Sequence, residues 1–284
     1  RWIDVISEIA FLVMDLQDRD RPQLAWRFLN AWLEAFGDYA GTAVLRFYLL
    51  YRALVRAKVE AIRVSQAGIG ADEKAAVMRE FDGYLQLAGD YTAPPAPVLI
   101  ITRGVSASGK STLTQPLLEE LGAIRIRSDV ERKRLFGIPG NTPAHDSVGG
   151  GIYTPAASEQ TYDRLVELAG RVLAAGYTVV VDAACLQPQQ VARFRTLAES
   201  AGTGFVILEF TAPADVLRRR IEQREQGVSD ADRAVLEHQL STWQELSGDD
   251  LGHCIRIDTT GAADIGALLT QIGALTRSPG SPPA

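Results

Sequence analysis

Nine residues at 104–112, GVSASGKST, constrain the fold of this chain more than any other segment. They match the pattern G-x-x-x-x-G-K-[ST], whose glycines allow successive backbone N–H groups to point at phosphate oxygens. The apolar run VLIIT precedes them at 98–102, and the helical pattern LTQPLLEEL follows at 113–121. A phosphate-binding loop between a strand and a helix indicates an α/β fold that binds a nucleoside triphosphate.

The residue types in this loop have distinct expected tasks. Gly104 and Gly109 permit the backbone conformation, and Lys110 reaches the β and γ phosphates. The hydroxyl of Ser111 ligates Mg²⁺, and Thr112 supports the helix start or the α phosphate. We therefore expect ATP and Mg²⁺ as ligands. The expected nucleotide-binding residues are Gly104, Ser106, Ala107, Ser108, Gly109, Lys110, Ser111 and Thr112.

Short β-rich runs alternate with helical stretches on both sides of this loop. The four that follow it are IRIR at 124–127, TVVVD at 178–182, FVILEF at 205–210 and CIRID at 254–258. Such alternation predicts βαβ units and a parallel five-stranded sheet with helices on both faces. We expect this domain to span 98–274, followed at 275–284 by a disordered tail rich in Pro, Gly and Ser.

Residues 1–89 read instead as an all-helical domain. The spacing of apolar residues predicts four helices, at about 3–13, 22–37, 42–65 and 72–88. Pro22 suits the first turn of the second helix, and Gly37 suits its end. Three prolines at 94, 95 and 97 cannot continue a helix, so residues 90–97 are expected to be an extended linker between two domains.

Composition excludes few functions. Lys and Arg total 29 and Asp and Glu total 35, and the resulting net charge of −6 disfavours a broad basic surface for nucleic acid without excluding a local patch. Cys185 and Cys254 are too few for a disulfide framework or a metal cluster, as expected in a reducing cytoplasm. No run of about 18 apolar residues is available to cross a membrane. Because the chain enters directly into a helical pattern at Arg1, we expect a fragment of a longer protein.

An acidic residue closes the third β-rich run. Asp182 ends TVVVD and would lie beside the phosphate loop, where it would hold Mg²⁺ through water. A strand-ending Asp is also a common turn or cap residue, so the position alone leaves both interpretations open. The adjacent phosphate loop favours the metal role.

A second acidic residue follows the second β-rich run, in SDVERKR at 128–134. Asp129 would lie at the carboxyl edge of the sheet and act as a general base, and Arg132, one helical turn later, would bind an anionic substrate or the transferring phosphoryl group. The alternative is structural. Ser128 and Glu131 would form a capping box in which Asp129 merely favours the helix dipole.

Arginines gather in LRRRIEQREQGVSDADR at 217–233. Arg220 and Arg224 are four residues apart and share one helical face, from which a lid could bring their guanidinium groups over the nucleotide. A solvated basic helix paired with Glu222 and Glu225 is the alternative interpretation, although it explains only some of these arginines.

With these elements in place, the run from 98 to about 272 resembles the small P-loop kinases of the gluconate kinase, zeta toxin, adenylylsulfate kinase and polynucleotide 5′-kinase type, also described as AAA-type predicted kinases. Their D-x-x-R element matches Asp129 to Arg132, and their R-x-x-x-R lid matches Arg220 to Arg224. The resemblance implies transfer of the γ-phosphoryl group of ATP to a hydroxyl of a small molecule or a nucleic-acid end. Lys110, Mg²⁺ and the lid arginines would stabilise the transferring group.

The N-terminal segment RWIDVISEIAFLVMDL at 1–16 resembles the closing helices of an aminoglycoside phosphotransferase-like kinase lobe. The H-G-D loop and the metal-binding acid of that family are absent from this sequence. The resemblance therefore implies a remnant scaffold that packs against the second domain and has no phosphotransferase activity of its own.

Two other classes of function stay open at this point. One is a switch or assembly ATPase that signals to a partner through the helical half, and the other is a structural helical protein whose phosphate loop has no function. GTP is disfavoured because no N-K-x-D motif exists. The glycine-rich residues 137–154 would form either a flap over the acceptor or a mobile loop.

Overall fold

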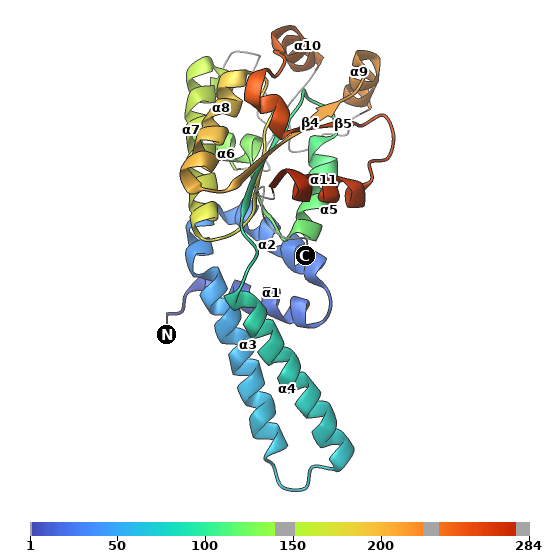
Figure 1. The fold of residues 1–284 in the computed structure, drawn as a ribbon. Coiled ribbons are helices and arrows are strands. Elements are labelled where there is room, and N and C mark those ends of the chain that lie inside the picture. The colour runs from blue at the N-terminus through green and yellow to red at the C-terminus, as the bar shows by residue number, and fades with distance from the viewer. Residues whose placement is uncertain (1, 140–150, 224–232, 277–284) are drawn as a thin grey trace.

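The computed structural model describes residues 2–139, 151–223 and 233–276. Their helices and strands form two parts, which we call the helical part (residues 2–92) and the sheet part (residues 98–276) (Figure 1). The sheet part contains a parallel five-stranded sheet with helices on both faces, and the helical part contains helices alone. The fold class predicted from the sequence is confirmed.

All four strand pairings in the sheet are parallel, in the order β2-β3-β1-β4-β5. The strands are β1 (Val98–Arg103), β2 (Ile124–Arg127), β3 (Val179–Asp182), β4 (Gly204–Thr211) and β5 (Cys254–Asp258). Their central residues are β-branched or otherwise apolar and buried on both faces, as helices covering each side of a parallel sheet require. From β1 the chain crosses to β2, returns to β3 between them, and then passes to β4 on the other side of β1. The direction of winding therefore reverses between β3 and β1. Ligands bind beyond the carboxyl ends of strands at such a point.

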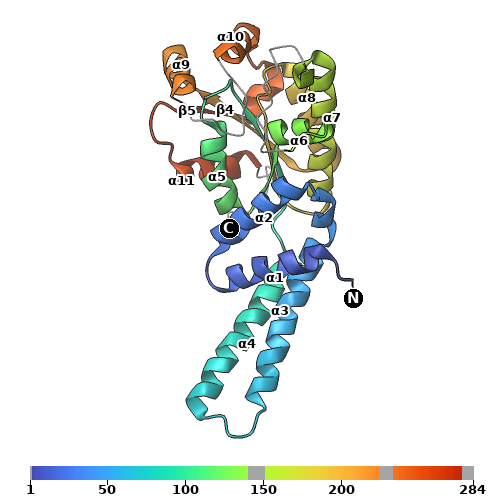
Figure 2. The same ribbon diagram turned by 180° about the vertical axis from the view of Figure 1, so that it is seen from behind.

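Helices cover both faces of this sheet, and each face has its own hydrophobic cluster. Leu99 and Ile101 pack with α7 and α8, whereas Ile100 between them packs with α5 and α11 on the opposite face (Figures 1 and 2). The helices of the sheet part are α5 (Lys110–Leu121), α6 (Ser128–Leu135), α7 (Pro155–Ala174), α8 (Pro188–Ala201), α9 (Ala214–Glu222), α10 (Arg233–Thr242) and α11 (Ile265–Thr276), with short 3-10 helices η2 (Gly151–Tyr153) and η3 (Gly248–His253).

The helical part confirms the four predicted helices. They are α1 (Val5–Asp18), α2 (Pro22–Phe36), α3 (Thr42–Val64) and α4 (Ala71–Thr92), with the 3-10 helix η1 (Tyr39–Gly41) between α2 and α3. Helix α2 starts at Pro22 and ends at Gly37, whose φ of 74° is the left-handed conformation that favours glycine at a helix end. Helices α3 and α4 form a long hairpin that extends away from the sheet (Figures 1 and 2).

The helical part packs directly on the sheet part through α2 and α3. The side chain of Asn30 donates to the Ala123 carbonyl at 2.9 Å and accepts from the Arg125 N–H at 2.6 Å. The guanidinium of Arg27 donates twice to Glu119, at 2.7 and 2.9 Å. One hydrophobic cluster continues from α1 to the sheet face under α7 and α8. The two parts therefore share a core.

Two predicted boundaries are shifted. Helix α4 continues to Thr92, so the first three residues of the predicted linker 90–97 belong to the helix. Tyr91 explains the extension, because it is half-buried and its hydroxyl donates to Gln17 of α1 at 2.5 Å. At the other end, α11 includes Thr276 and so enters the predicted tail 275–284, whose remaining residues lie outside the described ranges.

The helices in the described ranges fall short of the requirements for crossing a membrane. No helix there combines the length and the apolar character needed to cross a membrane.

Candidate functional site

The carboxyl ends of β1, β2 and β3 bring together the residues predicted from separate motifs. The phosphate loop leaves β1, Asp129 lies at the start of α6 directly after β2, and Asp182 is the last residue of β3. Arg127 and Asp182 are direct partners in the β2–β3 register. The three segments therefore lie at one edge of the sheet, at the point where its winding reverses.

Glycines are required at two positions of the phosphate loop. Gly104 has a φ of 149°, and a Cβ atom there would lie 2.7 Å from the carbonyl oxygen of Phe210. Gly109 has a φ of 88° and immediately precedes α5. The N-cap residue of α5 is Gly109, which has no side chain to cap the first turn, and the N-terminus of a helix is a favourable place for an anion. Ala107 also has a positive φ, of 61°, which is unusual for a residue with a side chain.

The side chain of Lys110 folds back along the first residues of the phosphate loop. Its Nζ group donates to the carbonyl oxygens of Gly104 and Val105, both at 2.8 Å. Ser108, in the middle of the loop, is fully buried. Thr112 is exposed in the first turn of α5, and its predicted role stays a prediction. The amine therefore lies over the first half of the loop.

Two oxygen ligands suited to Mg²⁺ lie next to each other. The hydroxyl of Ser111 donates to the Asp182 carboxylate at 2.9 Å, and Asp182 is itself buried. Thr102 steadies the end of β3, because its hydroxyl donates to the Ala183 carbonyl at 2.7 Å and accepts from the Ala183 N–H at 2.9 Å. A hydroxyl and a carboxylate are the hard ligands that Mg²⁺ prefers, so the residues present fit this cation.

Asp129 is held by an ion-pair chain that begins in the helical part. Its carboxylate accepts from Arg127 at 2.8 Å, and the same guanidinium donates to Glu34 of α2 at 2.9 Å. Arg125 also pairs with Glu34, at 3.2 Å. Burial alone would lower the pKa of Arg127, but the carboxylates of Asp129, Glu34 and Asp182 raise it overall. Arg127 is therefore a fixed cation between the two predicted acids.

The capping-box alternative for this segment is wrong. Helix α6 begins at Ser128 itself, and its N-cap residue, Arg127, makes no side-chain capping bond. In the first turn, the Asp129 carboxylate accepts from the neighbouring Val130 N–H at 3.0 Å. Glu131 points instead to α7 and is buried between Arg134 and Arg164, with its carboxylate 3.7 Å from the Arg164 Nε. Asp129 therefore does not belong to a capping box.

Arg132 lies in a half-buried position beside this edge. Its guanidinium donates to the Ile152 carbonyl at 2.9 Å and to the Ser158 hydroxyl at 3.2 Å, and it lies 5.2 Å from the centre of the Tyr153 ring. Burial lowers the pKa of this guanidinium, because desolvation disfavours the cation. Its described contacts are to η2 and α7.

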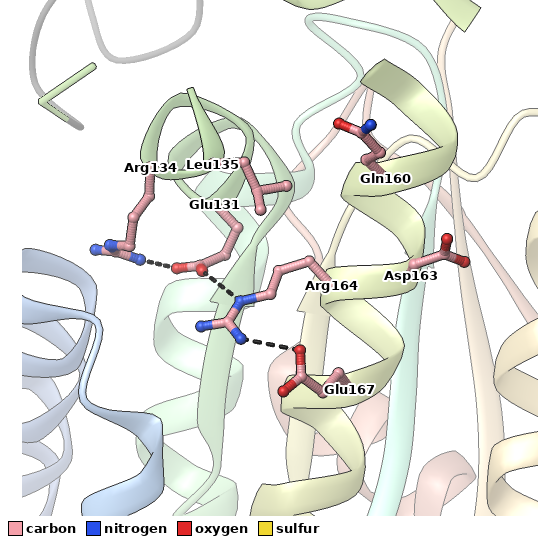
Figure 3. A pocket seen from close by; sticks show the side chains of 7 residues that line it. All are labelled: Glu131, Arg134, Leu135, Gln160, Asp163, Arg164 and Glu167. Atoms are coloured by element: carbon pink, nitrogen blue, oxygen red, sulfur yellow. Dashed lines mark hydrogen bonds and ion pairs between the residues drawn. The ribbon is translucent and has the colours of Figure 1, made fainter. Parts of the chain in front are cut away.

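A cavity of about 550 Å³ lies between α6 and α7. Figure 3 shows that Glu131 lies between Arg134 and Arg164, and that Arg164 also reaches Glu167. The lining of the cavity also includes Leu135, Gln160 and Asp163. These ion pairs join α6 to α7, and the predicted site residues do not line this cavity.

The predicted lid is partly described. Arg220 donates from Nη1 to the Ala107 carbonyl at 3.2 Å and to the Thr259 hydroxyl at 3.0 Å, so it joins the phosphate loop to the end of β5. Arg224 lies outside the described residues. The alternative pairing within a solvated helix is not seen for Arg218, which pairs with Glu237 of α10 at 2.7 Å.

Arg127, described above, was not predicted as a site residue, and three further contributors to this site were not predicted either. Glu34 comes from the helical part, and Gln239 of α10 accepts a hydrogen bond from the Ser106 N–H at 2.6 Å. Arg103, at the end of β1, is fully buried, forms an ion pair with Glu209 of β4 and lies 3.8 Å from the centre of the Trp243 ring. The charged residues within the apolar runs of β1 and β4 were a readable signal for the Arg103 pair. Nothing in the local sequence marks the other two.

Both cysteines are free thiols. Burial raises the pKa of Cys185 to about 12, so its thiol stays protonated near neutral pH, which supports a packing role.

A family model described as an AAA domain matches residues 99–246, slightly more than half of the chain. Among curated proteins, uncharacterized proteins of Mycobacterium tuberculosis and Mycobacterium bovis are 34% identical over 264 residues. The matched region covers 92% of this chain and 50% of each relative. The chain therefore spans about half the length of the curated relatives it matches.

Similar solved structures are also found. Kti12 of Chaetomium thermophilum, in complex with ADP-AlF3, has a TM-score of 0.50 and 18% identity, and the match covers 63% of this chain and 100% of that one. A gluconokinase of Sinorhizobium meliloti has a TM-score of 0.42 and 22% identity, over 64% of this chain and 92% of that one. At 18% identity, the similarity to Kti12 shows a shared fold and no more.

The family match, the loop geometry and the strand order agree with one another. The predicted resemblance to the small P-loop kinases is confirmed for the sheet part, whereas the resemblance of the helical part to a phosphotransferase lobe stays a prediction. This chain belongs to the AAA domain family and has the P-loop kinase fold.

Proposed function

We propose that this chain is an ATP-dependent kinase that transfers the γ-phosphoryl group to a hydroxyl of a small-molecule or polynucleotide acceptor. The observation that carries this proposal is the meeting of three groups at one sheet edge. These groups are the phosphate loop, the Ser111–Asp182 oxygen pair and the Asp129 carboxylate held by Arg127. A protein that only bound nucleotide would not require the third group.

On the phosphate side, the loop from Gly104 to Thr112 would hold the triphosphate. Ser111 and Asp182 would hold Mg²⁺, the second of them through water. The bound cation would neutralise charge on the β and γ phosphates. Lys110 would add its amine to the same charge, and Arg220 with Arg224 would approach from the lid.

On the acceptor side, Asp129 would take the proton of the acceptor hydroxyl. The acceptor oxygen then forms a bond to the γ phosphorus as the bond from that phosphorus to the β–γ bridging oxygen breaks. ADP leaves with the electron pair of the broken bond, and the proton stays on Asp129 until it passes to water. Arg132 would bind an anionic group of the acceptor or the transferring phosphoryl group.

A panel of acceptors with γ-labelled ATP tests this proposal. It should contain sugars, nucleosides, aminoglycosides and oligonucleotides with a free 5′-hydroxyl, each with Mg²⁺ and with EDTA. A labelled acceptor that forms only with Mg²⁺ is the expected result. Hydrolysis of ATP without any labelled acceptor, stimulated by a protein partner, would show a switch or assembly ATPase instead.

We also propose a reducing location such as the cytoplasm, because both cysteines are free thiols and one is deeply buried.

A further inference from the structure

Helices α9 and α10 rest directly on the phosphate loop. Val105 of the loop is buried in a small cluster with Leu217 of α9 and Leu236 of α10. Arg218 of α9 donates twice to Glu237 of α10, at 2.7 and 3.1 Å, and so ties the two helices together. The position of α10 is therefore coupled to the loop through packed side chains.

Gln239 reaches the loop from this helix. It lies three residues after Leu236, and residues at that spacing share a helical face. Its side-chain oxygen accepts from the Ser106 N–H at 2.6 Å. An N–H group only donates, so the oxygen of the amide must face Ser106, and the Nε2 group with its two donors is directed elsewhere.

The contact between Gln239 and Ser106 lies where the γ phosphate of the expected triphosphate would be. Lys110 carries the amine that reaches the β and γ phosphates in loops of this pattern. That amine lies on the carbonyl oxygens of Gly104 and Val105, immediately before Ser106. A side chain bound to the Ser106 N–H is therefore beside the place of the terminal phosphate.

We propose that Gln239 is a nucleotide-binding residue whose Nε2 group donates a hydrogen bond to the γ phosphate of ATP while its oxygen keeps the Ser106 N–H. This inference rests on the proposed function, since it takes ATP as the ligand of the loop. A neutral amide adds a donor there without repelling the cations of Lys110 and Arg220, which already surround the loop. ADP lacks the γ phosphate, so Gln239 would make the site prefer ATP to ADP.

Two substitutions separate this donor role from a loop-holding role. Gln239→Ala removes both the oxygen and the donor. Gln239→Glu keeps an oxygen that accepts from Ser106, but it removes the donor and brings a negative charge towards the phosphate. His238→Ala is the matched control, because His238 is the exposed neighbour on the same helix.

The measurement is the affinity of the full chain for Mg-AMPPNP and for Mg-ADP by titration calorimetry, with thermal unfolding as the control for folding. We expect Gln239→Ala to weaken Mg-AMPPNP binding about tenfold, which is the loss of one hydrogen bond to a charged group, and to leave Mg-ADP binding unchanged. Gln239→Glu should weaken Mg-AMPPNP binding further, and His238→Ala should change neither affinity.

Each other outcome is decisive. If Gln239→Glu binds Mg-AMPPNP as tightly as the unaltered chain, or if Gln239→Ala weakens both nucleotides equally, Gln239 only holds the loop and the inference is wrong while the proposed function stands. If the unaltered chain binds neither nucleotide, the proposed function fails, and this inference fails with it.

Discussion

The phosphate loop and the carboxyl end of β2 with Asp129, which we call the acceptor edge after its proposed role, lie side by side at the end of the sheet. They are nevertheless held by different parts of the chain. The loop is braced from within the sheet part, by Asp182, Arg220 and Gln239. The acceptor edge is braced from the helical part, where Glu34 holds Arg127, and Arg127 holds Asp129. We infer that nucleotide binding and acceptor chemistry depend on separate supports and can be lost separately.

The largest effect should come from the loop itself. Lys110→Met removes the amine that we propose stabilises the transferring phosphoryl group, and we expect phosphoryl transfer to fall on the order of a thousandfold. Nucleotide binding should weaken as well, because the same amine would contact the phosphates of bound ATP. Initial rates with γ-labelled ATP and calorimetry with Mg-ADP measure the two effects. Full activity in this variant would remove the loop from the mechanism.

The acceptor edge should respond differently, with a loss of transfer and no loss of nucleotide binding. Asp129→Asn keeps the size of the side chain but removes the proposed base, so transfer to the acceptor should fall about a hundredfold or more. The affinity for Mg-ATP should stay unchanged, because Asp129 lies outside the loop. Rates and calorimetry on the same preparation test the contrast with Lys110→Met. Equal loss of both properties would contradict separate supports.

The buried ion pair that joins β1 to β4 beneath the loop should contribute to the free energy of unfolding. Glu209 is buried between Arg103 and Arg256, and Glu209→Gln would leave Arg103 as an uncompensated buried cation. We expect the free energy of unfolding to fall by about 3 kcal/mol. Urea denaturation measures this value. Glu245→Gln is the control, because Glu245 is exposed and lies 3.7 Å from the exposed Arg256. Its other contact, the hydrogen bond from the Trp243 Nε1 at 3.1 Å, can be accepted by the amide oxygen of Gln as well. A similar loss in both variants would show that burial is not the cause.

The smallest effect should come from Glu34, which holds Arg127 of the sheet part from the helical part. Glu34→Gln weakens the hold on Arg127, so Asp129 loses its fixed position and kcat should fall about tenfold, with an unchanged KM for ATP. Glu8→Gln is the matched control. It breaks an ion pair of the helical part, with Arg52 at 2.5 Å, that has no link to the site. A change in both variants would indicate a general loss of stability in the helical part.

The confirmed predictions share a local cause. The loop pattern, the five β-rich runs and the stop at Gly37 depend on residues within one or two turns of each other, so the sequence shows them directly. The wrong interpretation was also local, because Ser128 and Glu131 have capping-box spacing but Glu131 found buried partners on α7. The linker began late for a comparable reason, the contact of Tyr91 with α1.

The sequence by itself determined the phosphate loop, the parallel sheet and the presence of acids after two strands, because these features follow from periodicity and spacing. Only the tertiary structure decided which distant side chains support them. Glu34 and Arg127 are 93 positions apart, and Ser106 and Gln239 are 133 apart. Such pairs form only after the core has brought α2 and α10 to the sheet, so no local pattern records them.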